Sequence, residues 1–279
     1  MIKLQDKHII LTGAGAGIGE ATANVLAEAG ARLTIVDRDG ERLNTVAQSL
    51  KERFENEVVV VESTLHDQVS AKKVIEAHIQ AYGKLDILIN NASSMQGAIA
   101  FAEFATEDFE TMLQDNIHSL FHMTQCALPL LKDNPDGGHI INTGSISGLA
   151  GQPQQAPYAG TKAYIHAFTK TLSTEQTPNG IRVNAVAPGP IATQMTEGKA
   201  DSVSAMVPMG RRGTPFEIAN PILFLCSDLA SYVNGEVIVV DGGMAGGVGG
   251  NGETASKKLS ASPKMPYELK HQYDGDERE

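Results

Sequence analysis

The sequence predicts an α/β fold: one doubly wound parallel sheet with helices on both faces. Short runs rich in Val, Ile and Leu alternate with stretches of helical periodicity, as strands and their covering helices do in such sheets. A glycine-rich turn separates the first apolar run from the first helical stretch. Polar or glycine residues follow several strands, and the carboxyl ends of parallel strands meet at the edge where these sheets bind ligands.

Length and composition favour a single large domain over residues 1–244 of a 279-residue chain that is 42% hydrophobic. A formal charge of -11 and a pI near 5.2 argue against a nucleic-acid surface, which is basic. The chain enters its first strand without the regions of a signal peptide, and it contains no run of about 18 apolar residues. We therefore expect a cytoplasmic protein without nucleic-acid or membrane partners.

Two cysteines, Cys126 and Cys226, lie in apolar helical runs without a CxxC motif. Buried, reduced, structural cysteines are therefore expected in preference to a disulfide or a metal pair. The histidines are scattered without the short spacings of a metal site. We expect no metal ion at the active site.

The strand His8–Thr12 passes directly into the turn Gly13–Gly19 and then into a helical pattern over residues 20–29. Glycines here permit a tight turn and the close approach of a pyrophosphate, which sits at the helix N-terminus. The next strand, Arg32–Val36, ends at Asp37, whose carboxylate can accept both hydroxyls of an adenosine ribose. This order predicts a Rossmann-like dinucleotide site.

Asp37 also bears on the choice of cofactor. A carboxylate at the ribose position repels the 2′-phosphate of NADP(H), so we expect NAD(H) as the cofactor. Arg38 opposes this choice, since an arginine can pair with that phosphate. Asp37 occupies the ribose-facing position itself, whereas Arg38 can turn into solvent or stack on the adenine. We therefore expect Asp37 to dominate.

Strands and helices continue to alternate to the end of the domain. Expected strands are 57–61, 85–90, 138–143, 181–187 and 237–240, and expected helices include 67–81 and a long one over 106–131. Thr214–Glu217 supplies an N-cap, a proline at the first helical position and the reciprocal Glu of a capping box. Pro221, inside the helix that follows, is expected to kink it.

Two segments lack a clear periodicity. Residues 190–213, which follow the stop at Pro188-Gly189, are interpreted as a mobile lid over the substrate. Within them Met195, Met206 and Met209 would either line an adaptable apolar pocket or pack in the core. Residues 245–279 are rich in glycine and polar side chains, which is typical of a flexible tail.

Ser145, Tyr158 and Lys162 lie at spacings that allow their side chains to converge. If a helix begins near Ala156, Tyr158 and Lys162 share one face, and the lysine ammonium would lower the phenol pKa from its usual value of about 10. Ser145 follows a strand, where its hydroxyl can hydrogen-bond a substrate oxygen. Taken alone, a Tyr and a Lys four apart are more often a surface pair. Together, the three residues indicate proton transfer to or from an alcohol or carbonyl.

The chain resembles the short-chain dehydrogenases/reductases over roughly residues 3–243. The resemblance rests on TGAGAGIG (Thr12–Gly19), NNAS (Asn90–Ser93), Asn116, Ser145, YAGTK (Tyr158–Lys162), PGPIAT (Pro188–Thr193) and VDGG (Val240–Gly243). It implies that Tyr158 is the catalytic acid/base, that Lys162 lowers its pKa and binds the nicotinamide ribose, and that Ser145 positions the carbonyl oxygen. It further implies that Asn116 holds a water in the proton relay.

The same resemblance implies the contacts of the cofactor. The phosphates, the adenosine, the ribose and the carboxamide would meet Gly13, Gly17, Ile18, Gly19, Asp37, Thr64, Leu65, Asn91, Ala92, Pro188, Ile191 and Thr193, together with Tyr158 and Lys162. Two positions depart from the family pattern. Ser93 stands where the family usually has glycine, and Thr64 stands where an aspartate commonly meets the adenine amine. We expect Thr64 to weaken adenine binding at most.

Three functions fit these residues. The leading expectation is an NAD-dependent alcohol dehydrogenase or ketoreductase acting on a small secondary alcohol or ketone. The alternative is a 3-oxoacyl-carrier-protein reductase using NADPH, which the segment Met209–Asp228 resembles. A third is a catalytically silent dinucleotide-sensing regulatory protein. The resemblance also implies a homotetramer. Ser94, Met95, Gln96, Gln152, Gln154 and Met195 are expected to set the substrate.

Overall fold

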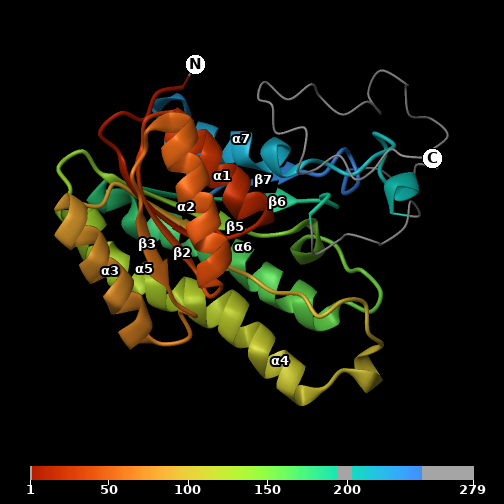
Figure 1. Ribbon diagram of the computed structural model, residues 1–279. Coiled ribbons are helices and arrows are strands. Elements are labelled where there is room, and N and C mark those ends of the chain that lie inside the picture. The colour runs from red at the N-terminus through yellow and green to blue at the C-terminus, as the bar shows by residue number, and fades with distance from the viewer. Residues whose placement is uncertain (1, 194–202, 247–279) are drawn as a thin grey trace.

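Seven parallel strands in the order β3-β2-β1-β4-β5-β6-β7 form the centre of the computed structural model, which describes residues 2–193 and 203–246 (Figure 1). The strands are β1 (His8–Thr12), β2 (Arg32–Asp37), β3 (Val59–Glu62), β4 (Ile87–Asn90), β5 (Gly138–Thr143), β6 (Ile181–Pro188) and β7 (Val237–Val240). The strand order reverses between β1 and β4, which opens a crevice at the carboxyl ends of these strands. The predicted doubly wound fold is confirmed.

Helices cover both faces of the sheet (Figure 1). One layer contains α1 (Gly17–Glu28), α2 (Gly40–Phe54) and α7 (Pro215–Cys226), and the other contains α3 (Gln68–Tyr82), α4 (Thr106–Leu113), α5 (Ser119–Asp133) and α6 (Ala156–Gln176). A π-helical segment, η2 (Gln114–His118), joins α4 to α5. Short 3₁₀ turns complete the described chain: η1 (Phe101–Glu103), η3 (Ile146–Gly148), η4 (Thr177–Asn179), η6 (Ser204–Met206) and η7 (Asp228–Ala230).

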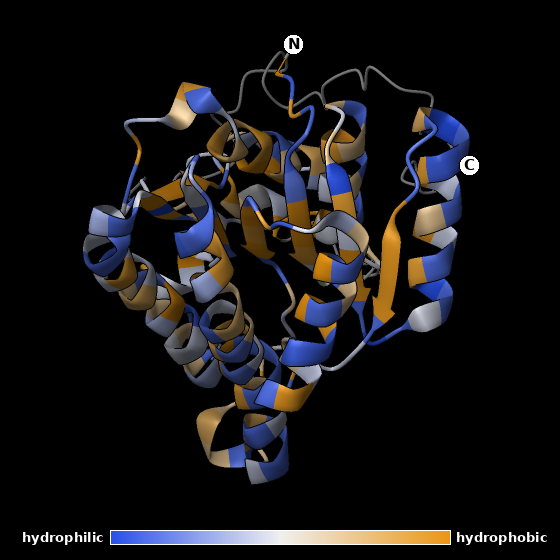
Figure 2. Ribbon diagram, turned by 90° about the vertical axis from the view of Figure 1, so that its left-hand side faces the viewer, coloured by the Kyte–Doolittle hydropathy of each residue, from blue (hydrophilic) through white to orange (hydrophobic). Residues whose placement is uncertain are grey.

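Alternating strand residues supply the two halves of the core. Ile9 and Leu11 pack toward α1, α2 and α7, whereas Ile10 packs with Leu88 and Ile140 toward α3 and α5. Figure 2 shows the strands as apolar ribbons at the centre, with hydrophilic residues on the helices around them. This pattern explains the near-continuous apolar runs of the strands, because both of their faces are buried.

Several element boundaries differ from those expected. The long helix predicted over 106–131 is divided by η2, which adds one residue to the turn that carries Asn116. β3 begins at Val59, two residues later than expected, and Glu57 lies in the loop before it, where its exposed carboxylate pairs with Lys51. The capping box of Thr214 and Glu217 is present, and α7 continues through Pro221.

Parts of the predicted lid and tail lie outside the described residues. These are residues 194–202, with Met195, and residues 247–279. Cys126 and Cys226 are both free thiols, and Cys226 is buried. None of the helices in the described ranges has both the length and the apolar character needed to cross a bilayer.

Candidate active site

A cavity of about 990 Å³ lies at the carboxyl ends of the central strands, at the upper end of the roughly 300–1,000 Å³ typical of ligand sites. Its walls include all the residues that the sequence assigns to the cofactor: Gly13, Gly17, Ile18, Gly19, Asp37, Thr64, Leu65, Asn91, Ala92, Tyr158, Lys162, Pro188, Ile191 and Thr193. Ser145 lines the same space, and Asn116 lies behind its wall. The fold therefore brings distant motifs into one cleft.

The glycine turn leaves room that other residues would fill. Gly13 and Gly17 have φ values of +64° and +57°, and a Cβ at Gly13 would lie 2.7 Å from Cα of Ala92. A Cβ at Gly19 would overlap the carbonyl oxygen of Gly13, so the helix can approach the turn only with glycine here.

The start of α1 has the features of a phosphate site. Its N-cap is Ala16, whose side chain has no acceptor for the first amides, whereas α2 and α3 are capped by Asp39 and Asp67. The residues that carry these amides line the cavity, and the N-terminus of a helix favours an anion. This chemistry fits the pyrophosphate of a dinucleotide.

Asp37 is held in place by main-chain donors. Its Oδ2 accepts a hydrogen bond from the Gly15 amide at 2.9 Å, and its Oδ1 accepts one from the Asp39 amide at 3.1 Å. The carboxylate thus lies against the glycine turn at the end of β2. The ribose diol of a dinucleotide whose pyrophosphate lies at this turn would be within hydrogen-bonding reach of the carboxylate.

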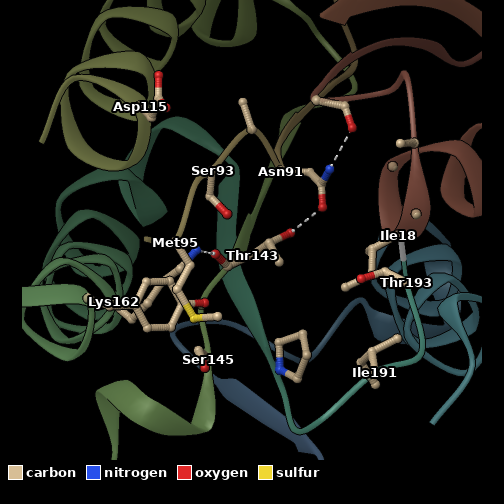
Figure 3. A pocket seen from close by; sticks show the side chains of 18 of the residues that line it. Ile18, Asn91, Ser93, Met95, Asp115, Thr143, Ser145, Lys162, Ile191 and Thr193 are labelled. Atoms are coloured by element: carbon tan, nitrogen blue, oxygen red, sulfur yellow. Dashed lines mark hydrogen bonds between the residues drawn. The ribbon is translucent and has the colours of Figure 1, made fainter. Parts of the chain in front are cut away.

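Asn91 connects three strand ends on the cavity wall (Figure 3). Its Nδ2 donates to the Gly13 carbonyl at 3.0 Å, and its Oδ1 accepts from the Thr143 hydroxyl at 3.2 Å. The Thr12 hydroxyl accepts from the Asn91 amide at 3.0 Å. The sequence assigned no role to Thr143 or to Thr12, the first residue of the glycine motif, because a threonine that ends a strand gives no distinctive signal. The three side chains fix the spacing between β1, β4 and β5.

Lys162 and Ser145 both lie near the Thr143 end of this wall (Figure 3). Lys162 is fully buried on α6, and its Nζ donates to the main-chain oxygen of Thr143 at 3.0 Å. It also lies 5.6 Å from the ring centroid of Tyr158, so the expected shared face is present. The Ser145 hydroxyl accepts from the Ser147 amide at 3.2 Å and leaves its proton to donate toward the cavity.

The pKa values differ from the expectation that Lys162 lowers the pKa of Tyr158. Burial raises the pKa of the Tyr158 phenol, and the hydrogen bond with Ser145 only partly opposes this rise. Burial also lowers the pKa of Lys162 to about 7. Desolvation disfavours both charged forms, because each group is buried away from water. The pocket therefore holds a neutral phenol, ready to donate a proton.

The Asn116 side chain links the loop after β4 to α6. Its Oδ1 accepts from the Ser94 amide at 2.7 Å, and its Nδ2 donates to the Ser94 carbonyl and the Thr161 hydroxyl, both at 3.0 Å. The loop after β4 is thereby fixed to α6. Both amide hydrogens are used in these contacts, so the water-holding role implied by the resemblance stays a prediction.

His166 is a buried residue of the site that the sequence did not reveal. Its Nε2 accepts from the Ser145 amide at 3.4 Å, and its ring fills the space where a Cβ of Gly144 or Gly148 would lie. Burial, and then the nearby Lys162, lower the pKa of His166, which keeps the ring neutral and able to accept. One imidazole thus supports both ends of the Ser145 turn.

The substrate end of the cavity mixes apolar and amide side chains. Met95 and Gln152, both expected to set the substrate, line it together with Ser93, Ala98, Ser147, Pro153, Gln155, Val203, Met206 and Met244. Ser94, Gln96 and Gln154 lie off its walls. Gln154 still matters to the wall, because its carbonyl accepts from the Ile99 amide at 3.0 Å and joins the two loops.

Known proteins share this architecture. A family model described as enoyl-(acyl carrier protein) reductase matches residues 13–245. The 3-oxoacyl-[acyl-carrier-protein] reductase FabG of Aquifex aeolicus is 39% identical over 248 residues, which are 87% of this chain and 99% of that protein.

Two solved structures are similar along almost their whole length. Levodione reductase superimposes with a TM-score of 0.85 and 30% identity over 88% of this chain and 100% of its own. The 3-ketoacyl-(acyl-carrier-protein) reductase of Brucella melitensis, complexed with NADH, gives a TM-score of 0.83 and 31% identity over 87% of this chain and 100% of its own. The chain therefore belongs to the short-chain dehydrogenase/reductase family of oxidoreductases.

Proposed function

We propose that the protein interconverts a ketone and a secondary alcohol by hydride transfer with NAD(H). The observation that carries this proposal is the convergence of Ser145, Tyr158 and Lys162 on a cavity that has a glycine turn at its other end. A nicotinamide dinucleotide supplies or accepts the hydride when bound. Tyr158 gives its proton to the carbonyl oxygen during reduction and takes one from the hydroxyl during oxidation, while Ser145 donates a hydrogen bond to the same oxygen.

Lys162 supports this proton transfer from below the ring. With a pKa near 7, its amine is partly protonated at neutrality, and this charge 5.6 Å from the ring centre would stabilise the phenolate that Tyr158 becomes when it gives up its proton. Its hydrogen bond to Thr143 fixes the amine in the cavity floor. These contacts support an active enzyme over a catalytically silent sensor, because each acid/base group has a defined partner.

The charges around the adenosine end support NAD(H) as the cofactor. Asp37 lies at the ribose position with both oxygens directed by main-chain amides. A 2′-phosphate there would meet a like charge, and two unit charges 4 Å apart repel by about 4 kcal/mol at an effective dielectric constant of 20. Half of this energy already corresponds to a preference of more than tenfold.

The relatives favour a 3-oxoacyl thioester as the substrate, which was the alternative from the sequence and not its leading expectation. The relative with 39% identity and a structure with a TM-score of 0.83 are both acyl-carrier reductases. That structure contains NADH, so the expectation of NAD(H) as the cofactor does not oppose this substrate class. We propose the 3-oxoacyl thioester as the first substrate class.

A free secondary alcohol or cyclic ketone is the second candidate. It is supported by the likeness to levodione reductase and by the apolar side chains of Met95, Val203, Met206 and Met244 at the mouth of the cavity. A homotetramer built through the helices of Asn116 and Tyr158, and a cytoplasmic location, also remain part of the proposal and rest on the family resemblance.

A single assay series tests the reaction, the substrate and the cofactor. Absorbance of NADH and NADPH at equal concentration is followed with a short 3-oxoacyl thioester and with a panel of cyclic ketones. We expect oxidation of NADH with the thioester, at a kcat/KM at least tenfold above that of the ketones. A higher kcat/KM with a ketone would favour the second substrate class. No turnover with any substrate would contradict the proposed reaction.

A further inference from the structure

A second buried carboxylate, Asp115, faces the adenosine end of the cavity. It belongs to η2, the π-helical segment, and lines the cavity (Figure 3), whereas Asn116, the next residue, is bound to Ser94. Its side chain is only 9% exposed. A buried carboxylate requires charged or hydrogen-bonding partners, and Asp115 has two.

The partners of Asp115 come from the ends of two neighbouring strands. Nη1 of Arg38, the residue after β2, lies 3.2 Å from its Oδ2, and Nε2 of His66, in the loop after β3, lies 2.8 Å from its Oδ1. Leu65, just before His66, has a φ of +61°, a conformation that costs energy for a leucine. This turn directs His66 toward Asp115. One carboxylate therefore ties both loops of the adenosine wall to the helix.

We propose that Asp115 is a specificity-determining residue that favours NAD(H) by holding Arg38 away from the 2′-position of the adenosine ribose. Arg38 follows Asp37 directly, so its guanidinium is the cation nearest in sequence to the ribose carboxylate, and it lines the same cavity. Released, it can form a charge-assisted pair with a 2′-phosphate and offset the repulsion from Asp37. Bound to Asp115, it is already paired.

The burial of Asp115 makes this restraint stronger than an ordinary surface pair. The Arg38 side chain is 60% exposed, but its partner is almost fully enclosed, and leaving a buried carboxylate without its cation is costly. Arg42, the other arginine near the ribose, pairs with Asp39 at 3.1 Å, where both side chains are well exposed. That pair is screened by water and breaks easily. Of these two arginines of the cavity wall, Arg38 is therefore the one that a buried carboxylate holds in place.

The test is the ratio of the dissociation constants for NADPH and NADH, measured by fluorescence titration or calorimetry without substrate. The inference rests on the proposed NAD(H) cofactor, and binding separates it from the reaction itself. Asp115→Asn keeps the size of the side chain and an acceptor for His66 but removes the charge that holds Arg38. We expect NADPH to bind about tenfold more tightly than to the wild type, with NADH changed less than twofold.

Two further variants identify the cause. Glu110→Gln removes one negative charge from an exposed position on α4 that does not line the cavity, and we expect it to leave the ratio unchanged. Arg38→Met placed in the Asp115→Asn background should abolish the gain, because the gain requires the guanidinium. An equal loss of affinity for both dinucleotides in Asp115→Asn would show that the residue only supports the wall, and would overturn the proposal. Failure of the wild type to bind either dinucleotide would overturn both this inference and the proposed function.

Discussion

The Nζ of Lys162 lies 5.6 Å from the centre of the Tyr158 ring and is hydrogen-bonded to the main-chain oxygen of Thr143. The amine of Lys162 is thus buried between the Tyr158 phenol and the end of β5. Burial of this kind lowers the affinity of an amine for its proton, so Lys162 has consequences for stability as well as for chemistry.

The stability of the protein is expected to depend on pH through Lys162. Its pKa is about 7 in the folded protein and 10.5 in the unfolded chain. Below pH 7 both states carry the charge, so the full cost of burying it is present. Between pH 7 and 10.5 the folded state releases the proton while the unfolded state keeps it, so this cost fades as pH rises.

Lys162→Met should therefore stabilise the protein at pH 6 by about 2–4 kcal/mol, at 1.4 kcal/mol per unit of pKa and less the lost hydrogen bond. The gain should shrink steadily toward pH 9. Urea unfolding at several pH values measures it. Lys170→Met, an exposed lysine on the same helix, is the matched control and should show no such trend. A gain in stability that does not change with pH would contradict the lowered pKa of Lys162 in the folded protein.

Tyr158→Phe should remove nearly all turnover while leaving dinucleotide binding within about twofold of the wild type. The phenol proton is transferred in the reaction, whereas the ring itself only forms part of the wall. General acid–base catalysis contributes roughly 10²–10⁴-fold, so kcat should fall by at least a hundredfold. Steady-state kinetics and a fluorescence titration check the two parts. Activity within a few fold of the wild type would refute the assignment.

Asp37→Asn tests the charge at the ribose position. The amide keeps the shape and one acceptor for the Gly15 amide, but it removes the repulsion of a 2′-phosphate. We expect the preference for NADH over NADPH in kcat/KM to fall about tenfold. Asp37→Ala should give a similar shift in preference with a larger loss of NADH binding, because both main-chain amides then lose their acceptor. An unchanged preference would mean that another group selects the cofactor.

His166→Leu should lower kcat about tenfold with little change in dinucleotide binding. The leucine fills the space below Gly144 and Gly148 but leaves the Ser145 amide without an acceptor, which costs about 1–3 kcal/mol in a buried place. The Ser145 hydroxyl would then be less well placed. His122→Leu on α5 is the control for losing an imidazole elsewhere. If both variants behave alike, the Ser145 turn does not depend on His166.

Local chemistry explains which parts of this site could be predicted from the sequence. The glycine turn, Asp37 and the Tyr158 and Lys162 pair each lie within a short segment whose spacing is meaningful by itself. The pair of His66 and Asp115 joins residues 49 positions apart, so only the fold reveals it. The hydrogen bond from Ser145 to His166 could not be predicted either, since a lone histidine on a helix does not indicate which residue it contacts.

The π-helical segment was missed for a different reason. Periodicity correctly predicted a helix through Asn116, but one additional residue in a turn is within the tolerance of any apolar pattern. The raised pKa of Tyr158 was also not predicted, because burial depends on everything packed around the phenol. The sequence thus identified the reacting groups better than their electrostatic environment.

Because of the π-helical turn, the number of residues between α4 and α5 determines the direction of the site side chains as much as their identity does. Asp115 faces the adenosine wall and Asn116 holds the loop of Ser94, and both directions depend on the extra residue within Gln114–His118. Each residue of an α-helix advances the direction of its side chain by about 100°. Deletion of Ile117 alone would therefore rotate α4 against α5 and turn both side chains away from their partners, although no functional residue had been replaced. Insertions and deletions here should be tolerated far less than point substitutions.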